Sequence, residues 1–216
     1  MSKKLKIDIV SDVVCPWCTI GYKRLEKAIA ELGIEDQVEI EWQPFELNPN
    51  MPAEGQNLRE HISEKYGSTL EQQEESQQRM VDAGAELGFT FDYFGEMRMA
   101  NTFDAHILLE YAKDFGKQTQ LKMQLTKAFF SERKDVSKRA ILKQALLDVG
   151  LDAEEALSKL DNEEARYEVR TKQAYWKNLG VNSVPTFVLD RESALTGAQP
   201  VDVFKQVLTE ATQTND

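Results

Sequence analysis

The residues best suited to chemistry in this chain are Cys15 and Cys18, and the sequence contains no other cysteine. A disulfide that spans only two residues closes too small a loop to stabilise a fold appreciably. The pair therefore indicates redox reactivity or metal binding rather than a structural crosslink. A structural zinc site needs four ligands, and the chain adds only two histidines. We favour reactive thiols over zinc or an inert buried pair, and we expect no metal.

The residues around the pair predict how the thiols are positioned. Residues 5–10 (LKIDIV) alternate apolar and polar side chains, which is typical of a strand. After the cysteine motif, Ile20, Leu25, Ile29 and Leu32 recur at roughly helical spacing, and a glycine follows. Cys15 would then lie at the helix N-terminus, where the macrodipole stabilises a thiolate and lowers its pKa. Pro16 favours the first helical turn and helps to tune the reduction potential. Cys18, one turn on, can resolve a mixed disulfide.

The rest of the chain predicts a second strand, a long helical segment and a final hairpin. Residues 38–42 alternate and end before a proline, so strand, helix and strand form a βαβ unit with a parallel pair. Strands at 186–189 and 193–196 precede a helix from residue 201. Between these parts, strong helix formers dominate six segments: 56–66, 69–87, 100–115, 118–132, 138–149 and 153–178. We expect the last of these helices to be broken near residues 160–161.

The charge of the chain limits its partners. With 26 basic and 37 acidic residues the formal net charge is −11, which argues against general nucleic-acid binding and against docking to anionic lipid. The run at 72–78 (QQEESQQ) is typical of a solvated helix face. No apolar run approaches the roughly 18 residues of a membrane span. Acidic residues also interrupt the lysine-rich N-terminus where a signal peptide would be apolar, so we expect a cytoplasmic protein.

A second feature lies far from the cysteines, where Val184-Pro185 opens the strand at 186–189. Proline cannot donate to a sheet, so this position indicates a turn, an edge or a cis bond. From these residues alone a trans bond is favoured, because cis is the minority form. In the cis form the backbone of Val184 would face outward and could pair with a substrate beside Cys15.

Five segments, in this order over nearly the whole chain, resemble the DsbA-like branch of the thioredoxin superfamily, and most closely its FrnE-type oxidoreductases. They are Ser11–Cys18 (SDVVCPWC) with Gly21, Phe45–Pro49 (FELNP), Asn101–His106 (NTFDAH), Val184-Pro185 and Gly197–Gln199 (GAQ). Together these segments are far more specific than the CPWC motif alone.

The resemblance implies an α/β protein with a thioredoxin fold and a large all-helical insertion domain. The thioredoxin-like domain would comprise residues 1–48 and 165–216, and the insertion residues 49–164. The resemblance also implies a redox-active CXXC centre that acts as a protein-disulfide oxidoreductase, with Cys15 as nucleophile and Cys18 as resolving thiol. It makes cis the expected form of the Val-Pro bond.

The same branch includes the 2-hydroxychromene-2-carboxylate isomerases and kappa-class glutathione transferases, which typically carry serine at the nucleophile position and use glutathione. The two cysteines here depart from that pattern and favour disulfide exchange with protein or small thiol substrates. No cofactor is required, and glutathione is a candidate redox partner. A glutathione-dependent isomerase or transferase is the alternative, and a binding protein whose CPWC motif only senses oxidation is a third. The sequence carries no signal for an oligomeric state.

Other residues could act on the thiols or bind substrate. Trp17 would be either an exposed apolar contact for substrate or a partly buried helix residue. Asp12 could tune the thiol pair or cap a local turn. His106 could pair with Cys15 across the helical insertion, or be a hydrogen-bonded residue of the core. Asn101 could line the substrate cleft.

Overall fold

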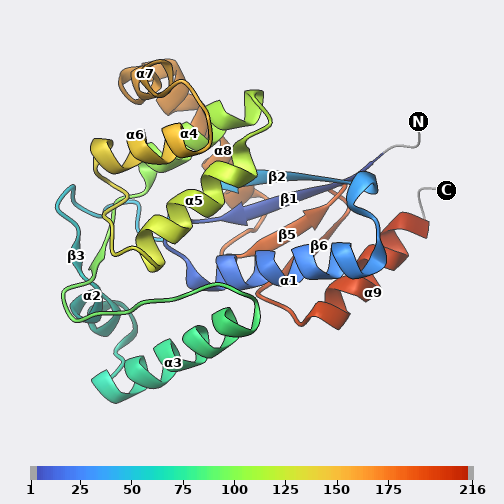
Figure 1. Cartoon of the computed structure of the whole chain (residues 1–216), viewed down its shortest axis with the longest axis horizontal. Helices are drawn as coiled ribbons and strands as arrows, with labels where there is room; N and C mark the ends of the chain where they lie inside the picture. Colours follow the sequence, from blue (N-terminus) through green and yellow to red (C-terminus); the bar gives the residue numbers. More distant parts are fainter. Residues whose placement is uncertain (1–3, 214–216) are drawn as a thin grey trace.

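The computed structural model describes residues 4–213, and its centre is a four-stranded sheet in the order β2-β1-β5-β6 (Figure 1). β1 pairs in parallel with β2 and antiparallel with β5, so that Ile9 lies opposite both Trp42 and Phe187. The expected parallel pair and C-terminal hairpin are confirmed. The strands are β1 (Leu5–Ser11), β2 (Val38–Pro44), β5 (Thr186–Leu189) and β6 (Ser193–Thr196).

Helices cover both faces of this sheet, because successive side chains of β1 point to opposite sides. Ile7 and Ile9 pack against α1 and α9, which lie side by side along the sheet in Figure 1. Val10 faces the other way and packs with Trp176 of α8. The cysteine motif follows directly after the end of β1. The bounds of these helices are α1 (Pro16–Leu32), α8 (Glu163–Asn178) and α9 (Val201–Gln213).

Helix α1 has clear local reasons to begin and end where it does. Pro16 occupies its first turn, and Gly33 ends it with the left-handed φ of 66° that glycine adopts freely. Gly21 lets the helix approach the loop before β5. A Cβ at Gly21 would lie 3.0 Å from Phe187 Cζ and 3.2 Å from Pro185 Cγ. This close approach seats the cysteine motif against the proline loop.

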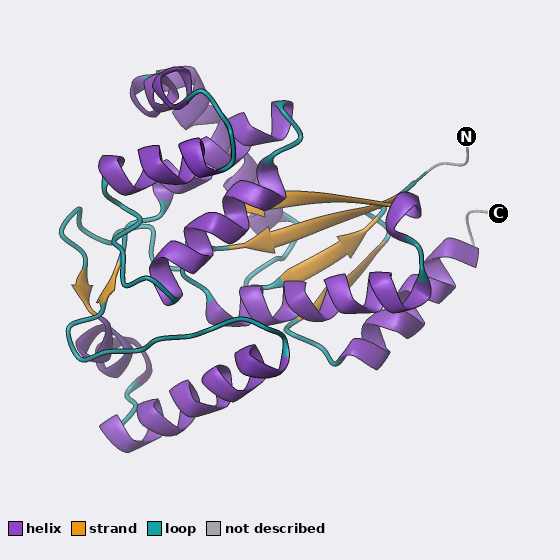
Figure 2. Cartoon of the chain, viewed as in Figure 1, coloured by secondary structure: helices purple, strands orange, loops and turns teal. Residues whose placement is uncertain are grey.

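The segment that joins β2 to β5 contains most of the helices, together with loops and one short ribbon of two strands (Figure 2). Side-chain caps explain several helix starts: Asn57 caps α2, Thr69 and Gln72 form a capping box at α3, and Asn162 caps α8. The helices before α8 are α2 (Leu58–Tyr66), α3 (Leu70–Glu86), α4 (Phe103–Asp114), α5 (Gln118–Phe130), α6 (Arg139–Asp148) and α7 (Ala153–Ser158).

This helical insertion has an apolar core of its own, which reaches the cysteine motif. Leu121 and Leu125 of α5 are among its fully buried members. Val13, Val14 and Ile20 from the junction of β1 and α1 belong to the same cluster. The cysteine motif therefore lies where the sheet and the insertion meet.

The thioredoxin fold with a helical insertion is the one the sequence implied. The expected break near 160–161 is a 3-10 turn, Lys159–Asp161, between α7 and α8. A 3-10 turn at Glu35–Gln37 and a ribbon of β3 (Gln56–Asn57) and β4 (Arg98–Met99) were not predicted, because strands of two residues show no alternation. The domain boundary at 164/165 stays a prediction, since α8 contributes to both the insertion core and the sheet. Within residues 4–213, no helix is long and apolar enough to cross a bilayer.

Candidate active site

Both cysteines lie at the start of α1 and are buried free thiols. Cys15 immediately precedes the helix and has an extended backbone (φ −96°, ψ 110°), whereas Cys18 lies in the first turn. The two residues approach each other to 3.1 Å. Cys15 lines a cavity, whereas Cys18 is only 1% exposed and is not among the residues of that lining. Cys15 is therefore the thiol that faces the cavity, and Cys18 lies behind it.

The Val184–Pro185 segment covers another side of Cys15. Its peptide bond is cis, and the thiol of Cys15 donates to the carbonyl oxygen of Val184 at 3.9 Å. The N–H of Gly197 donates to the carbonyl of Pro185 at 2.8 Å, which ties this loop to the end of β6. Segments 169 residues apart in the chain thus meet at the thiol.

Behind the cysteines, Asp12 is the centre of a buried polar cluster. The Asp12 carboxylate accepts the N–H of Val13 at 2.7 Å and the N–H of Leu47 at 2.8 Å. Nε2 of His106, on α4, lies 3.2 Å from Asp12 Oδ1, and both side chains are almost fully buried. His106 therefore pairs with Asp12, and Asp12 ties the cysteine loop both to the chain after β2 and to the insertion.

Lys122 of α5 adds a cation to this cluster. It is 3% exposed, its ammonium lies 5.1 Å from the centroid of the Trp42 ring, and it borders a narrow gap together with Ser11 and His106. Burial lowers the pKa of Lys122, and the nearby Cys18 and Asp12 charges oppose this only in part. The insertion thus supplies a cation to the rear of the thiol pair.

The electrostatics of Asp12 favour its charged form. Burial raises the pKa of this carboxyl group, but the hydrogen bond and charge of His106, the Leu47 N–H and the charge of Lys122 together outweigh burial. The pKa of Asp12 therefore lies below its ordinary value, and the carboxylate stays ionised at neutral pH.

The pKa values of the two thiols shift in opposite directions. Hydrogen bonding to Cys18 and burial raise the pKa of Cys15 well above its ordinary value. Burial raises the pKa of Cys18, but the hydrogen bond from Cys15, the charge of Lys122 and the hydroxyl of Ser11 outweigh it, so that pKa is lowered. The expectation of a lowered pKa at Cys15 is therefore not met in the dithiol, because Cys18 and burial raise that pKa, whereas Lys122 and Ser11 favour charge on Cys18.

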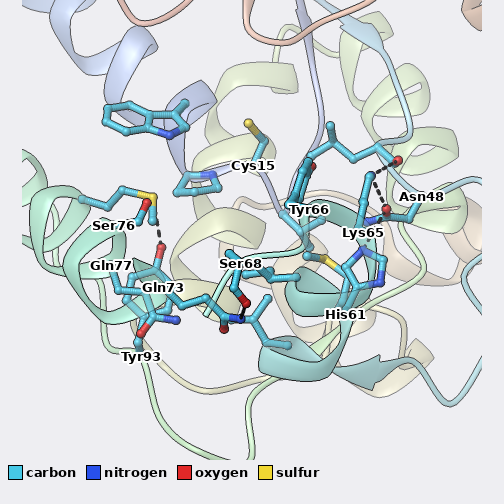
Figure 3. A pocket seen from close by; sticks show the side chains of 18 of the residues that line it. Cys15, Asn48, His61, Lys65, Tyr66, Ser68, Gln73, Ser76, Gln77 and Tyr93 are labelled. Carbon is cyan, nitrogen blue, oxygen red and sulfur yellow. Dashed lines mark hydrogen bonds between the residues drawn. The ribbon is translucent and has the colours of Figure 1, made fainter. Parts of the chain in front are cut away.

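A cavity of about 420 Å³ opens beside Cys15, between the cysteine motif and helices α2 and α3 (Figure 3). On one side, Asn48, His61 and Lys65 form a connected polar group: His61 Nε2 lies 3.0 Å and Lys65 Nζ 2.7 Å from Asn48 Oδ1. Ser76 lies on the opposite side of the cavity in Figure 3. Cys15 is thus open to a ligand of small size.

Of the other residues that were predicted to contact substrate, some line this cavity and one does not. Trp17 lines the cavity and is 39% exposed, and Val184 lines it as well. Asn101 is not part of this lining: its Nδ2 donates to the Met51 carbonyl at 2.8 Å and its Oδ1 accepts the Phe103 N–H at 3.0 Å. Asn101 therefore holds the start of α4.

The interpretation of residues 72–78 as a solvated helix face is partly wrong. Glu74 and Glu75 are exposed, but Gln73 is buried, and Ser76 and Gln77 line the cavity. The sequence shows a uniformly polar run, and only the tertiary packing of α3 separates its two sides.

Two residues near the thiols were not predicted. Lys122 was missed because it lies in a helix rich in lysine and glutamine, where a solvent-facing position is the simpler interpretation. Tyr93 lines the cavity, and burial together with the nearby Cys15 raises its pKa. Across residues 4–213, no group of three or more His, Cys, Asp or Glu side chains is arranged to hold a metal ion.

Comparison with known proteins places these features in a family. The family model described as DSBA-like thioredoxin domain matches residues 6–209. The uncharacterized protein YwbO of Bacillus subtilis is 28% identical over 207 residues, which cover 94% of this chain and 96% of that protein. The probable DsbA oxidoreductase SCO1869 of Streptomyces coelicolor is 33% identical with a TM-score of 0.90, over 97% of this chain and 90% of that one.

More distant solved structures share the fold. The cytosolic disulfide reductase DsbM of Pseudomonas aeruginosa, solved with GSH, has a TM-score of 0.67 at 16% identity and covers 96% of this chain and 99% of its own. A 2-hydroxychromene-2-carboxylate isomerase has a TM-score of 0.74 at 13% identity, with 97% of both chains covered. With the family model spanning nearly the whole chain around a buried CPWC pair, the chain belongs to the DSBA-like thioredoxin domain family.

Proposed function

We propose that the protein is a thiol–disulfide oxidoreductase in which Cys15 and Cys18 exchange disulfides with protein or small thiol substrates. The observation that carries this proposal is the unequal placement of two free thiols on residues that approach each other to 3.1 Å. Cys15 faces a cavity and the Val184 carbonyl, whereas Cys18 lies behind it beside the buried Lys122. The similarity to the probable DsbA oxidoreductase of Streptomyces coelicolor supports the proposal.

The first step is attack of the Cys15 thiolate on a substrate disulfide. In the form of the dithiol that carries one proton, Cys15 passes this proton to Cys18 and attacks as the thiolate. A bond then forms between Cys15 and one substrate sulfur, the substrate disulfide breaks, and the other sulfur leaves as a thiolate. Val184 and Pro185 present backbone to the substrate beside Cys15, and Trp17 provides an apolar contact.

In the second step, Cys18 attacks the sulfur of Cys15 in the mixed disulfide. The Cys18 proton goes to the thiolate that left first, and Lys122 stabilises the Cys18 thiolate that remains. The Cys15–Cys18 disulfide forms, the second substrate sulfur leaves, and two electrons have passed to the substrate. The reverse sequence oxidises a substrate dithiol. Asp12, paired with His106, modulates the charge balance behind the thiols.

The same scheme fits a reducing compartment. It needs no bound cofactor and no metal, and we propose glutathione as a redox partner. The similarity in fold to a disulfide reductase described as cytosolic supports a cytoplasmic location.

A second candidate function is that of a glutathione-dependent isomerase or transferase. The cavity beside Cys15 and the similarity in fold to 2-hydroxychromene-2-carboxylate isomerase favour it. Cys18 has no chemical role in that reaction, so the Cys18→Ser variant would keep its activity. The dithiol reaction, in contrast, ends at the mixed disulfide when Cys18 is absent.

The experiment that tests the proposal is a measurement of the reduction potential. The protein is equilibrated in glutathione buffers, and its thiols are trapped and counted by mass. We expect a reversible two-electron transition between the dithiol and the Cys15–Cys18 disulfide. Its midpoint, compared with a cytosolic poise of roughly −220 to −320 mV, gives the direction of electron flow. If only a stable glutathione adduct on Cys15 forms, the proposal fails and the second candidate replaces it.

A further inference from the structure

The cavity beside Cys15 has a lining whose charge differs from that of the whole chain. Asp and Glu make up 37 of 216 residues, so about four would be expected among the 22 described residues of the lining, and none occurs there. Lys65 is present in this lining, with His61 beside it. In a chain of net charge −11, a wall without carboxylates that carries a cation is complementary to an anion.

Helix α3 shows how carboxylates are kept away from the cavity. Glu74 and Glu75 are exposed, whereas Gln73, Ser76 and Gln77 belong to the lining. The helix thus presents neutral polar groups to the cavity although its sequence is acidic. Gln73 Oε1 is buried and has no hydrogen-bond partner among the described residues, which leaves an acceptor in the wall.

Lys65 is positioned to receive the anionic group. Its ammonium donates to the Leu47 carbonyl at 2.9 Å and to Asn48 Oδ1 at 2.7 Å. An ammonium group has three N–H donors, and both of these acceptors are neutral. The ammonium also lies 5.5 Å from the centroid of the Tyr66 ring. One N–H donor therefore has no acceptor among the hydrogen bonds of the described residues and can serve an anion at the cavity wall.

The rest of the wall suits an apolar body of small size. A volume of about 420 Å³ lies within the range of small-molecule sites. Two aromatic side chains of the lining, Trp17 and Tyr66, are exposed to solvent. The apolar part of the lining includes Leu58, Ile62, Met80, Phe129 and Phe130.

We propose that this cavity binds the substrate of the thiol exchange, and that this substrate is a small disulfide with an aromatic body and a carboxylate. The inference rests on the proposed function, because it places the substrate disulfide at Cys15 and its carboxylate at Lys65. The dithiol supplies two electrons. Cys15 bonds to one substrate sulfur as the other leaves, Cys18 then displaces the first, and the substrate departs as two thiols.

The test is single-turnover reduction of three disulfides by the reduced full-length protein. Dithiobis(nitrobenzoate) is aromatic and anionic, dithiodipyridine is aromatic and uncharged at neutral pH, and bis(hydroxyethyl) disulfide is small and uncharged. Each rate constant is divided by that of dithiothreitol with the same disulfide, so that the reactivity of the leaving thiol cancels. We expect the wild-type protein to prefer the anionic aromatic disulfide.

Two variants separate charge from shape. Lys65→Gln should lower the preference for dithiobis(nitrobenzoate) over dithiodipyridine about threefold to fivefold, the effect of one partly exposed ion pair. Lys143→Gln removes an exposed lysine of α6 outside the lining, and it should leave that preference within about twofold. Ser76→Trp fills the cavity and should lower the preference for both aromatic disulfides over bis(hydroxyethyl) disulfide about tenfold.

The outcomes distinguish this inference from the proposed function. If Lys65→Gln slows the charged and uncharged aromatic disulfides equally, or if Ser76→Trp leaves their preference unchanged, the assigned substrate class is overturned. If the wild-type protein forms no Cys15–Cys18 disulfide with any of the three compounds, the proposed function itself fails.

Discussion

The two sulfurs of the CPWC motif face regions of opposite character. Cys15 opens on an apolar cavity without carboxylates, whereas Cys18 lies against a buried cluster of charged and polar groups. The helical insertion builds both regions, with α2, α3 and the end of α5 on the side of Cys15 and with α4 and Lys122 of α5 on the side of Cys18. In the proposed reaction, the insertion therefore uses different residues for substrate contact and for control of the thiol charge. Changes on one side should leave the chemistry of the other side intact.

The largest effect is expected from Cys18→Ser. Without the second thiol the mixed disulfide on Cys15 has no resolving group, so turnover should fall to background and the adduct should accumulate. Mass spectrometry of the intact protein would detect one substrate half on Cys15. In the matched Cys15→Ser variant we expect no such adduct. Full turnover by the Cys18→Ser protein would contradict the division of roles between the two sulfurs.

A smaller effect is expected from Lys122→Met, which changes only the surroundings of Cys18. The charge of Lys122 lowers the pKa of Cys18, so its removal should raise that pKa and move the pH profile of the resolution step to higher pH. At neutral pH a smaller fraction of Cys18 would then be thiolate, and the step should slow about threefold to tenfold. Stopped-flow measurement of the resolution rate against pH would show this.

The matched control for this variant is Lys127→Met, on the same helix. Lys127 is largely exposed and pairs with Glu132 at 3.1 Å, so its loss should leave the pH profile in place. A Lys122→Met protein that is less stable but keeps the wild-type pH profile would show that Lys122 acts through packing on Trp42 alone.

Glu41→Gln should change stability without changing the thiols. Glu41 of β2 contacts Lys6 and, across to α4, Lys113, each at 2.6 Å. Burial opposes its charge, but the two lysines lower its pKa to about 2. A carboxylate with a lowered folded-state pKa stabilises the fold above its unfolded pKa. Because both lysines are partly exposed, we expect wild type to exceed the variant by about 1 kcal/mol at neutral pH.

That difference should shrink as the pH falls from about 5 towards 2, because Glu41 is protonated first in the unfolded chain and then in the folded protein. Urea unfolding of both proteins over this pH range would measure it. A constant difference at every pH would mean that Glu41 acts by packing, and altered thiol kinetics would contradict its separation from the two active-site regions.

The smallest effect is expected from Trp17→Ala, on the side of Cys15. The ring lines the cavity but is 39% exposed, so its removal should slow reduction of an aromatic disulfide only about twofold to threefold. The pH profile of the resolution step should stay that of the wild type. A displaced profile would show that the two sides of the motif are coupled through α1.

The sequence predicted those parts of the fold that have strong local signals. The proline at the start of α1, the glycine at its end and the alternation in β1 and β2 place these elements closely. Asp12 and His106 were identified as candidate residues, but their pairing joins positions 94 residues apart. No local pattern carries that information, so only the packing of α4 on the β1–α1 junction reveals it.

Helix α5 shows why Lys122 could not be predicted. Gln118, Lys122 and Thr126 recur at four-residue spacing, which in a sequence is typical of a solvent-facing stripe. In the structure all three are buried, and Gln118 exchanges hydrogen bonds with the backbone of Trp42. A polar stripe identifies a helix face, but it does not tell whether water or protein satisfies that face.

The separation of 169 positions between Cys15 and Val184 also affects the synthesis of the protein. During synthesis at about 5–20 residues per second, the ribosome adds Cys15 roughly 8 to 34 s before Val184. Throughout that interval the nascent dithiol has neither the Val184 carbonyl nor β5 beside it. The two cysteines are thus synthesised well before Val184 and β5, which pack beside them in the folded protein. During this interval the growing chain depends on its surroundings to keep both thiols reduced.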